Sequence, residues 1–342
     1  MYEDTFTPLV VTDPLQHTME DSLYGYLDLK VHEYVRTREY RKILIIGDDG
    51  RLDVSRFEKR DKPFNWQRPG ATITHDELHI HCYPGRDYVR HYASITATYL
   101  ALHQRRYDHV RYVLRDESFC RKALLRSNIL EIPKGDIAIL SFGLDQLIGY
   151  TPQWEGEGAF SWHQKKIGNM NAIFIGFRPS YWGDVAGRVV SILAELGFKQ
   201  VVYVGKLGAL QKDVEPNVSI ATGSLSFVEG EIVQWDNLFS FTKGRPGVVF
   251  GDHVSCPSIL FETKEWLYKN QAYDFVDPEI GHMAKEGVSA GIQFSYFHVI
   301  SDSLCLKFDE DLSNERKGAI REKRKVLLNF IREVFEEIGQ GY

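Results

Sequence analysis

The strongest constraint on the fold is a series of short runs that are apolar throughout. NAIFIGF covers residues 171–177, QVVYVGKLGAL covers 200–210 and FSYFHVIS covers 294–301, and GDIAILSFG begins at Gly135. Strands with one exposed face alternate between apolar and polar residues, whereas these runs do not. They therefore predict a largely parallel sheet covered by helices on both faces, which is an α/β fold.

Apolar residues at helical spacing lie between and after these runs. We expect helices from Trp182 to Gly197, over GHMAKEGVSAG at 281–291 and in the charged C-terminal segment that begins near Ile320. Ligands of such folds gather at the carboxyl ends of the strands. The residues that follow each apolar run are therefore the first candidates for a functional site.

A similar but smaller alternation precedes this series. KILIIGDDG (42–50), DELHIHCY (76–83) and HVRYVLRD (109–116) read as strands, and HYASITATYLALHQRR (91–106) reads as a helix. At 342 residues the chain is too long for one average core. We expect a small N-terminal α/β unit of unknown role over residues 1–132 and a second unit over 133–342.

Composition excludes several classes of function. The formal net charge of -6 gives no electrostatic footprint for nucleic acid, and no apolar stretch is long enough to cross a bilayer. The segment MYEDTFTPLVVTD lacks the features of a signal peptide, so we expect a cytoplasmic protein with no nucleic-acid or membrane partner. The four cysteines are scattered without a CxxC pair and predict neither disulfides nor a cysteine zinc site.

Two histidines of the first unit deserve a separate test as metal ligands. His79 and His81 would share one face of a strand, at a spacing that two ligands can use, but no third ligand is evident. A solvated strand face is the favoured interpretation. No metal site is predicted.

Asp302 is the first candidate for chemistry, because it follows Ser301 where an apolar strand meets the predicted crevice. Apolar neighbours would raise its pKa and keep it protonated near neutrality, so that it could donate a proton to a leaving group. The alternative is that Asp302 only caps a turn.

Glu279 lies at the predicted start of a helix, directly after Pro278. A carboxylate there could accept two hydrogen bonds from neighbouring hydroxyls, the geometry that a ribose presents. The alternative is a favourable interaction with the helix dipole. Asp277 competes for the same role, and chemistry alone does not exclude it.

The loop VGKLGAL offers a candidate anion site. Gly205 and Gly208 would let backbone N–H groups face an anion, Lys206 would add charge, and Arg178 ends the neighbouring strand. The alternatives are an ordinary glycine exit from a strand and a surface arginine.

Two longer segments resemble the purine nucleoside phosphorylase, uridine phosphorylase and nucleosidase superfamily. They are GFKQVVYVGKLGALQKDVEPNVSIATGS (197–224) and VDPEIGHMAKEGVSAGIQFSYFHVISDSL (276–304), and the resemblance extends over about residues 135–305. It implies a nucleoside phosphorylase-like three-layer domain with a mostly parallel central mixed sheet. It also implies a homo-oligomer that needs no metal or organic cofactor.

The resemblance further implies an enzyme that cleaves or transfers at the N-glycosidic bond of a purine nucleoside or nucleotide. By its motif, Glu279 would bind the ribose hydroxyls and Asp302 would protonate the departing purine. The bond then loosens toward an oxocarbenium-like sugar, and the base leaves once its developing charge is neutralised. Ile259 and Phe261, in DHVSCPSILFET, would supply the apolar surface for the base, unless both are core residues.

Departures from the family pattern leave the nucleophile open. Phosphorylases carry an arginine where this chain has Tyr203 and a phosphate-binding serine at Lys206, and Pro278 replaces a methionine that contacts base and sugar. Hydrolysis by water and phosphorolysis with inorganic phosphate both remain, and Lys206 with Arg178 could instead bind the 5′-phosphate of a nucleotide.

Three further alternatives stand beside this interpretation. The chain could be a non-catalytic sensor of nucleosides or nucleotides that has lost the nucleophile site. The N-terminal unit could carry a separate activity through its histidines and arginines. Trp154, Phe160 and Trp162 could form a lid over the site or pack at a subunit interface.

Overall fold

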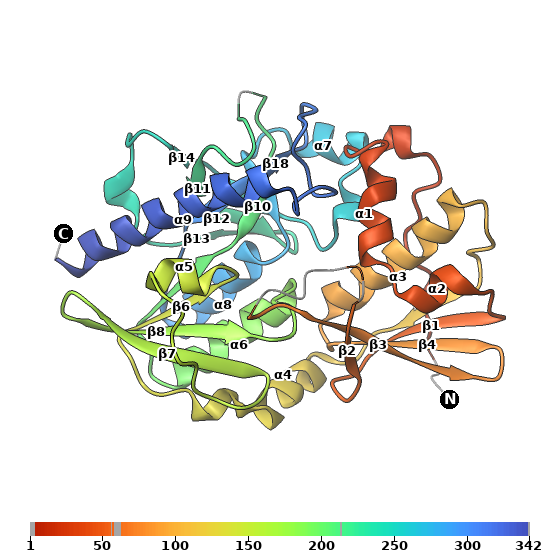
Figure 1. Cartoon of the computed structure of the whole chain (residues 1–342), viewed down its shortest axis with the longest axis horizontal. Coiled ribbons are helices and arrows are strands. Elements are labelled where there is room, and N and C mark those ends of the chain that lie inside the picture. The colour runs from red at the N-terminus through yellow and green to blue at the C-terminus, as the bar shows by residue number, and fades with distance from the viewer. Residues whose placement is uncertain (1–3, 56, 58–62, 213, 341–342) are drawn as a thin grey trace.

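The computed structural model describes residues 4–55, 57, 63–212 and 214–340. The structure has three β-sheets, with the N-terminal sheet on the right of Figure 1 and the other two on the left. The predicted α/β class is confirmed. Within the described residues, no helix has the length and apolar character that a membrane span requires.

The N-terminal sheet has the strand order β2-β3-β4-β1-β5, with β1 parallel to both β4 and β5. Its strands are β1 (Lys42–Gly47), β2 (Leu52–Val54), β3 (Gln67–Thr74), β4 (Glu77–Cys82) and β5 (Val110–Val113). The helices of this region are α1 (Ser22–Lys30), α2 (Glu33–Thr37), α3 (Arg86–Leu102) and α4 (Glu117–Arg126). The three apolar runs predicted in this region are strands, and the predicted helix is α3.

A five-stranded sheet follows, in the order β17-β9-β6-β8-β7, and only the β8–β7 pair is antiparallel. Its strands are β6 (Ile137–Ser141), β7 (Phe160–Ile167), β8 (Met170–Phe177), β9 (Gln200–Val204) and β17 (Gln293–Tyr296). Two helices come from the same part of the chain, α5 (Leu144–Ile148) and α6 (Asp184–Glu195). Strand β7 lies between the glycine-rich loop and the β8 run, and it was not expected from the sequence.

The third sheet has eight strands, in the mixed order β13-β12-β15-β16-β10-β18-β11-β14. They are β10 (Lys206–Ala209), β11 (Ile220–Thr222), β12 (Leu225–Val228), β13 (Glu231–Gln234), β14 (Val248–Phe250), β15 (His253–Ser255), β16 (Phe275–Asp277) and β18 (His298–Ser303). The helices are α7 (Lys264–Asn270), α8 (Ile280–Ala290) and the long α9 (Gly318–Gly339), which crosses the left half of Figure 1 in dark blue.

Two predicted strands are each divided where they pass from the five-stranded to the eight-stranded sheet. The run 200–210 divides at Gly205 into β9 and β10, and the run 294–301 divides at Phe297 into β17 and β18. An added Cβ at Gly205 would lie 2.6 Å from Nε2 of His298, so only glycine allows the two strands to pass this closely. The candidate site lies beside this crossing.

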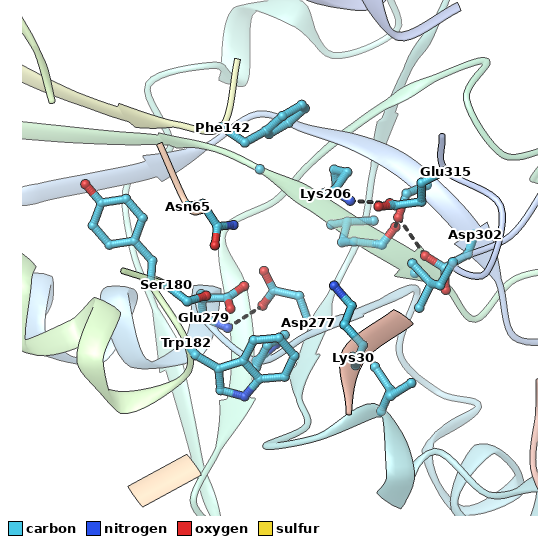
Figure 2. Close-up of a pocket in the computed structure, with 18 of the residues that line it drawn as sticks. Lys30, Asn65, Phe142, Ser180, Trp182, Lys206, Asp277, Glu279, Asp302 and Glu315 are labelled. Atoms are coloured by element: carbon cyan, nitrogen blue, oxygen red, sulfur yellow. Dashed lines mark hydrogen bonds and ion pairs between the residues drawn. The ribbon is translucent and has the colours of Figure 1, made fainter. Parts of the chain in front are cut away.

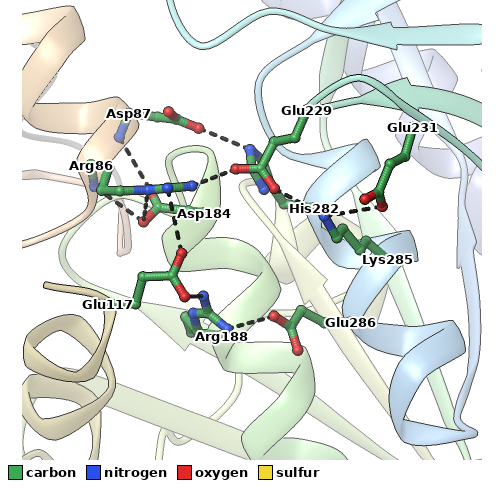
Figure 3. Close-up of polar contacts among 10 residues, drawn as sticks. All are labelled: Arg86, Asp87, Glu117, Asp184, Arg188, Glu229, Glu231, His282, Lys285 and Glu286. Carbon is green, nitrogen blue, oxygen red and sulfur yellow. Dashed lines mark hydrogen bonds and ion pairs between the residues drawn. The ribbon is translucent and has the colours of Figure 1, made fainter.

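A polar network joins the N-terminal region to the helices that follow (Figure 3). The carboxylate of Asp184, at the start of α6, accepts the N–H groups of Arg86 and Asp87 at 3.1 and 3.2 Å and so caps α3. Asp87 in turn pairs with His282 of α8, with 2.9 Å between Oδ2 and Nε2. Because Glu279 is the N-cap residue of α8, this network ties α3 to the helix that starts at the site.

Candidate functional site

A cavity of about 210 Å³ lies at the strand crossing and is lined by all three parts of the chain (Figure 2). The sheet regions supply Ser141, Phe142, Phe177, Tyr203, Gly205, Lys206, Leu207, Gly208, Val276, Asp277, Pro278, Glu279, Ser301 and Asp302. Loops and the N-terminal region supply Tyr26, Leu29, Lys30, Asn65, Arg68, Ser180, Tyr181, Trp182, Ile259, Glu262, Leu312, Glu315 and Arg316. The cavity therefore contains both carboxyl groups to which the sequence assigned chemistry.

Asp277 is an ionised carboxylate in the cavity wall. Its Oδ1 accepts the backbone N–H groups of Glu279 and Ile280 at 2.9 and 2.8 Å, which caps α8. Nε2 of His253 lies 3.0 Å from Oδ1, and Nε2 of His298 lies 3.6 Å from Oδ2. Burial acts to raise the pKa of Asp277, but the two histidines and their hydrogen bonds hold it below its ordinary value.

Glu279 lies next to the charged Asp277 but differs from it in protonation. Its side chain is buried, and the backbone N–H of Gly183 donates a hydrogen bond to it. Burial, and then the negative charge of Asp277, raise the pKa of Glu279 well above its ordinary value. Glu279 is therefore a neutral carboxyl group near pH 7, able both to donate and to accept hydrogen bonds with a pair of hydroxyls.

Asp302 is on β18, opposite Gly208 of β10 at a bulge in the parallel pairing. An added Cβ at Gly208 would lie 3.0 Å from Oδ2 of Asp302, so the glycine makes room for the carboxyl group. Burial raises the pKa of Asp302, and the carboxylate of Glu315 adds to the rise, while Ser301 and Lys206 oppose it.

Ser301 contacts Asp302 directly. Its hydroxyl donates a hydrogen bond to Oδ1 of Asp302 at 2.6 Å, and its oxygen lies 3.2 Å from the carbonyl oxygen of Leu207. A donor in this position favours the ionised carboxylate, so it acts against burial, which is the larger influence on the pKa of Asp302.

The glycine loop is in the cavity, but the charge of Lys206 is already matched. Its ammonium forms an ion pair with Glu315, whose Oε1 also lies 3.1 Å from Nη1 of Arg324. Gly205 brings its backbone over His298, and its N–H donates to Nδ1 of that histidine at 3.1 Å instead of facing an anion. Tyr203 lines the cavity beside it, with its ring 4.7 Å from the His298 ring.

The structure places Arg178 outside the cavity. Its neighbour Phe177 lines the cavity, and successive side chains of a strand point to opposite faces, so Arg178 turns away. Its guanidinium lies 3.4 Å from the hydroxyl of Ser161, and its carbonyl accepts the N–H groups of Trp66 and Gln67. The anion contact predicted for Arg178 is thus corrected to a structural contact with the segment after Phe64.

Phe261 is also placed elsewhere, whereas Ile259 lines the cavity as predicted. The two residues are at opposite ends of a single 3₁₀ turn, Ile259–Phe261. Phe261 packs against the small apolar cluster that includes Leu210 and Cys256. Its predicted contact with a base is corrected to a contact in this cluster.

The aromatic residues of the glycine-rich insertion form no lid over the cavity. Phe160 and Trp162 are buried in β7, and the ring of Phe160 stacks on Phe177 at 4.5 Å. Trp154 packs edge-on against Phe64 at 4.6 Å. These residues belong to the protein interior.

His79 and His81 of the N-terminal sheet each contact polar side chains of neighbouring residues in the structure. His81 is buried, with Nε2 3.0 Å from Oγ1 of Thr72 and Nδ1 3.2 Å from Asp48. His79 lies 3.4 Å from Glu77. The described residues contain no group of three or more ligands suited to a metal ion.

Sequence reasoning missed Glu262 and the N-terminal contribution to the cavity. Glu262 is 5% exposed, and burial, with the charges of Asp302 and Asp277, raises its pKa well above the ordinary value. Its only signal in the sequence is its place at the end of the loop predicted to face the base. Lys30 and Arg68 give no signal, because nothing local relates them to residues more than 100 positions away.

No family model matches the chain. Among curated proteins, Oxidoreductase cns1 of Cordyceps militaris is 26% identical over 263 residues, which cover 68% of this chain and 33% of that protein. The chain thus spans about a third of the length of this curated relative.

Several solved structures are similar to the chain. The purine nucleoside phosphorylase of Toxoplasma gondii, in complex with immucillin-H, has a TM-score of 0.49 and 13% identity, covering 62% of this chain and 94% of that one. A 5′-methylthioadenosine/S-adenosylhomocysteine nucleosidase of Neisseria meningitidis has a TM-score of 0.44 and 15% identity, covering 60% and 98%. Over about 60% of its length, the chain thus resembles solved nucleoside phosphorylases and nucleosidases.

Proposed function

We propose that the cavity binds a purine nucleoside or nucleotide and that the protein cleaves its N-glycosidic bond. The observation that carries this proposal is the meeting of Glu279 and Asp302 in one cavity. Burial raises the pKa of both carboxyl groups, and they come from different secondary-structure elements, so a single ligand can contact both. The sequence motifs around the two residues support the same assignment.

In the proposed reaction, the carboxyl group of Glu279 holds the two ribose hydroxyls. The electron pair of the bond from the sugar carbon to the base nitrogen moves to the base, and Asp302 gives its proton to the purine as the negative charge develops. The ionised Asp277, behind Glu279, is the negative charge nearest to the sugar, where positive charge accumulates. Gly205, Gly208, Pro278 and Ile259 shape the walls around the ligand.

The attacking group is water or inorganic phosphate. Its oxygen forms the new bond to the sugar carbon, giving free ribose in the first case and ribose 1-phosphate in the second, or the 5′-phosphorylated forms of these products from a nucleotide. Water loses a proton to solvent as it attacks, and solvent returns a proton to Asp302 after either reaction. Lys206 is paired with Glu315, so phosphate bound at the glycine loop would have to compete with a carboxylate. This contact favours water over phosphate at that loop. We propose no metal or organic cofactor for either reaction.

The test is release of free base from adenosine, inosine, guanosine and their 5′-monophosphates, with and without phosphate. Release without phosphate supports hydrolysis, and release only with phosphate supports phosphorolysis. Asp302→Asn and Glu279→Gln should each reduce release by about 10²-fold or more, whereas the exposed Asp309→Asn should not. Tight binding without any release contradicts catalysis and favours the sensor alternative.

A further inference from the structure

One wall of the cavity comes from the N-terminal region, and it carries positive charge. Helix α1 ends at the cavity, where Tyr26, Leu29 and Lys30 line it. In Figure 2 the ammonium group of Lys30 points into the cavity, between Asp277 and Asp302 in that view.

Two contacts fix α1 against the rest of the chain. At its start, the hydroxyl of Ser22 donates to Oδ2 of Asp311 at 2.6 Å, and at its end the hydroxyl of Tyr92 donates to the carbonyl of Lys30 at 3.2 Å. The position of Lys30 in the cavity wall is therefore set by tertiary contacts at both ends of its helix.

Arg68 brings a second cation to the same wall. Its segment is attached to the end of β8, because the N–H of Asn65 donates to the carbonyl of Phe177 at 2.9 Å. Nη1 of Arg68 donates to the carbonyls of Asn65 and Gln67 at 3.0 and 2.9 Å, and these contacts orient the guanidinium. Lys30 and Arg68 also border one further small cavity together, so both residues belong to the same part of the N-terminal wall.

The chemistry of the other walls is already assigned. Glu279 and Asp302 suit the sugar and the base, and Lys206 is neutralised by Glu315. Besides the sugar and the base, a nucleotide carries a phosphate group, and a nucleoside that undergoes phosphorolysis is bound together with free phosphate. Either phosphate needs a binding site of its own. A lysine point charge and an oriented guanidinium are the side chains that recognise phosphate.

We propose that Lys30 and Arg68 form a phosphate-binding subsite of the cavity. The phosphate is either part of the ligand, as in a nucleoside monophosphate, or free inorganic phosphate bound beside a nucleoside. This inference rests on the proposed function, since it takes the remainder of the cavity as the nucleoside site. It also gives the N-terminal region a role in the same site, in place of a separate activity.

The test is calorimetric titration of the full chain with adenosine, with AMP, and with adenosine in the presence of inorganic phosphate. The same set is repeated with inosine and IMP. Phosphate should strengthen binding by about tenfold or more, either as the 5′-phosphate of the nucleotide or as free inorganic phosphate, because hydrogen bonds to charged groups are worth about 1.5 to 3 kcal/mol. A preference for AMP assigns the phosphate to the ligand, and a gain from free phosphate assigns it to inorganic phosphate.

Variants then locate the subsite. The ratio to follow is the affinity with phosphate, bound or free, divided by the affinity for the nucleoside alone. Lys30→Met and Arg68→Met should each reduce this ratio toward one, whereas Lys30→Arg should preserve most of it. Lys122→Met, at an exposed position of α4, should leave the ratio unchanged. Circular dichroism and thermal unfolding of each variant confirm that it is folded.

Three outcomes overturn the inference. Equal affinity for adenosine and AMP, with no gain from phosphate, removes the subsite while leaving the proposed function intact. If Lys30→Met weakens binding of the nucleoside equally with and without phosphate, that lysine balances the charge of Asp277 and does not bind phosphate. If no nucleoside or nucleotide binds at all, the proposed function fails together with the subsite.

Discussion

The backbone N–H of Glu279 donates a 2.9 Å hydrogen bond to Oδ1 of Asp277. The carboxylate that caps α8 is thus also the charge that faces the neutral carboxyl group of the candidate site. One residue fixes the start of the helix, keeps its neighbour protonated and remains ionised between two histidines. Removing that single charge should affect both the stability and the site.

Asp277→Asn should lower the free energy of unfolding by about 1 to 3 kcal/mol, because asparagine can still cap the helix but loses the charged contacts with His253 and His298. The folded-state pKa of Asp277 lies below its unfolded value, so its contribution is present above the unfolded pKa and is lost only in acid. Urea denaturation should therefore show the same difference from the wild type at pH 5.5 and at pH 8, and no effect of the control Asp309→Asn. A difference that vanishes at pH 5.5 contradicts an ionised Asp277.

Ser301→Ala tests the pairing of the predicted acid. The hydrogen bond of Ser301 opposes the rise in the pKa of Asp302 that burial causes, so its removal should raise that pKa further. Because Asp302 must carry a proton to donate it, base release should fall as pH rises through this pKa, and the fall should move to higher pH in the variant. The measurement is the pH profile of base release, with Ser303→Ala as the control on the same strand. A profile that does not move would remove Asp302 as the acid.

His282→Asn should destabilise the fold by about 3 kcal/mol, because it leaves Asp87 buried without its ion-pair partner. Burial acts to lower the pKa of His282, but the hydrogen bond and charge of Asp87 raise it above the ordinary value. The pair therefore stabilises fully below the ordinary histidine pKa and loses its effect as pH rises through the raised one. Thermal unfolding from pH 6 to 9 should show the variant approaching the wild type, while the half-exposed control His79→Asn stays close to it throughout.

Glu262→Gln should stabilise the protein at alkaline pH. The folded-state pKa of Glu262 is raised, so its contribution to stability is present below the unfolded pKa and is lost as pH rises toward the folded value. Glutamine avoids this loss, and the variant should exceed the wild type by about 1 kcal/mol or more at pH 8 and little at pH 4.5. Chemical denaturation at both values measures this, with the exposed Glu265→Gln as control. Equal stability at pH 8 would show that Glu262 is ionised without cost.

The parts of the site that follow from the sequence are those set by local order. Glu279 lies at the start of α8 and Asp302 near the end of β18, within one stretch of about 25 residues, and the apolar runs beside them indicated their burial. Arg178 was located correctly at a strand end, but the alternation of side chains sends Phe177, not Arg178, into the cavity. Whether a terminal residue faces a cleft depends on strand register, which the pattern of an entirely apolar strand does not reveal.

The remaining parts depend on tertiary contacts between distant segments. Lys30 reaches the cavity because Ser22 binds Asp311, and Arg68 does so because Asn65 binds the end of β8. Strand β13 was missed because its residues are mostly exposed and polar, and β3 because it contains a proline and a glycine. The contacts that place Lys30 and Arg68 are not present in a window of sequence around either residue.

The central claim is that Glu279 and Asp302 act on the two sides of one sugar-to-base bond. The most direct measurement is a crystal structure of the Asp302→Asn variant soaked with adenosine or inosine. We predict the ribose hydroxyls within hydrogen-bond distance of Glu279 and the purine ring beside residue 302. A nucleoside bound in this cavity with its ribose away from Glu279, or bound elsewhere on the protein, would contradict the account.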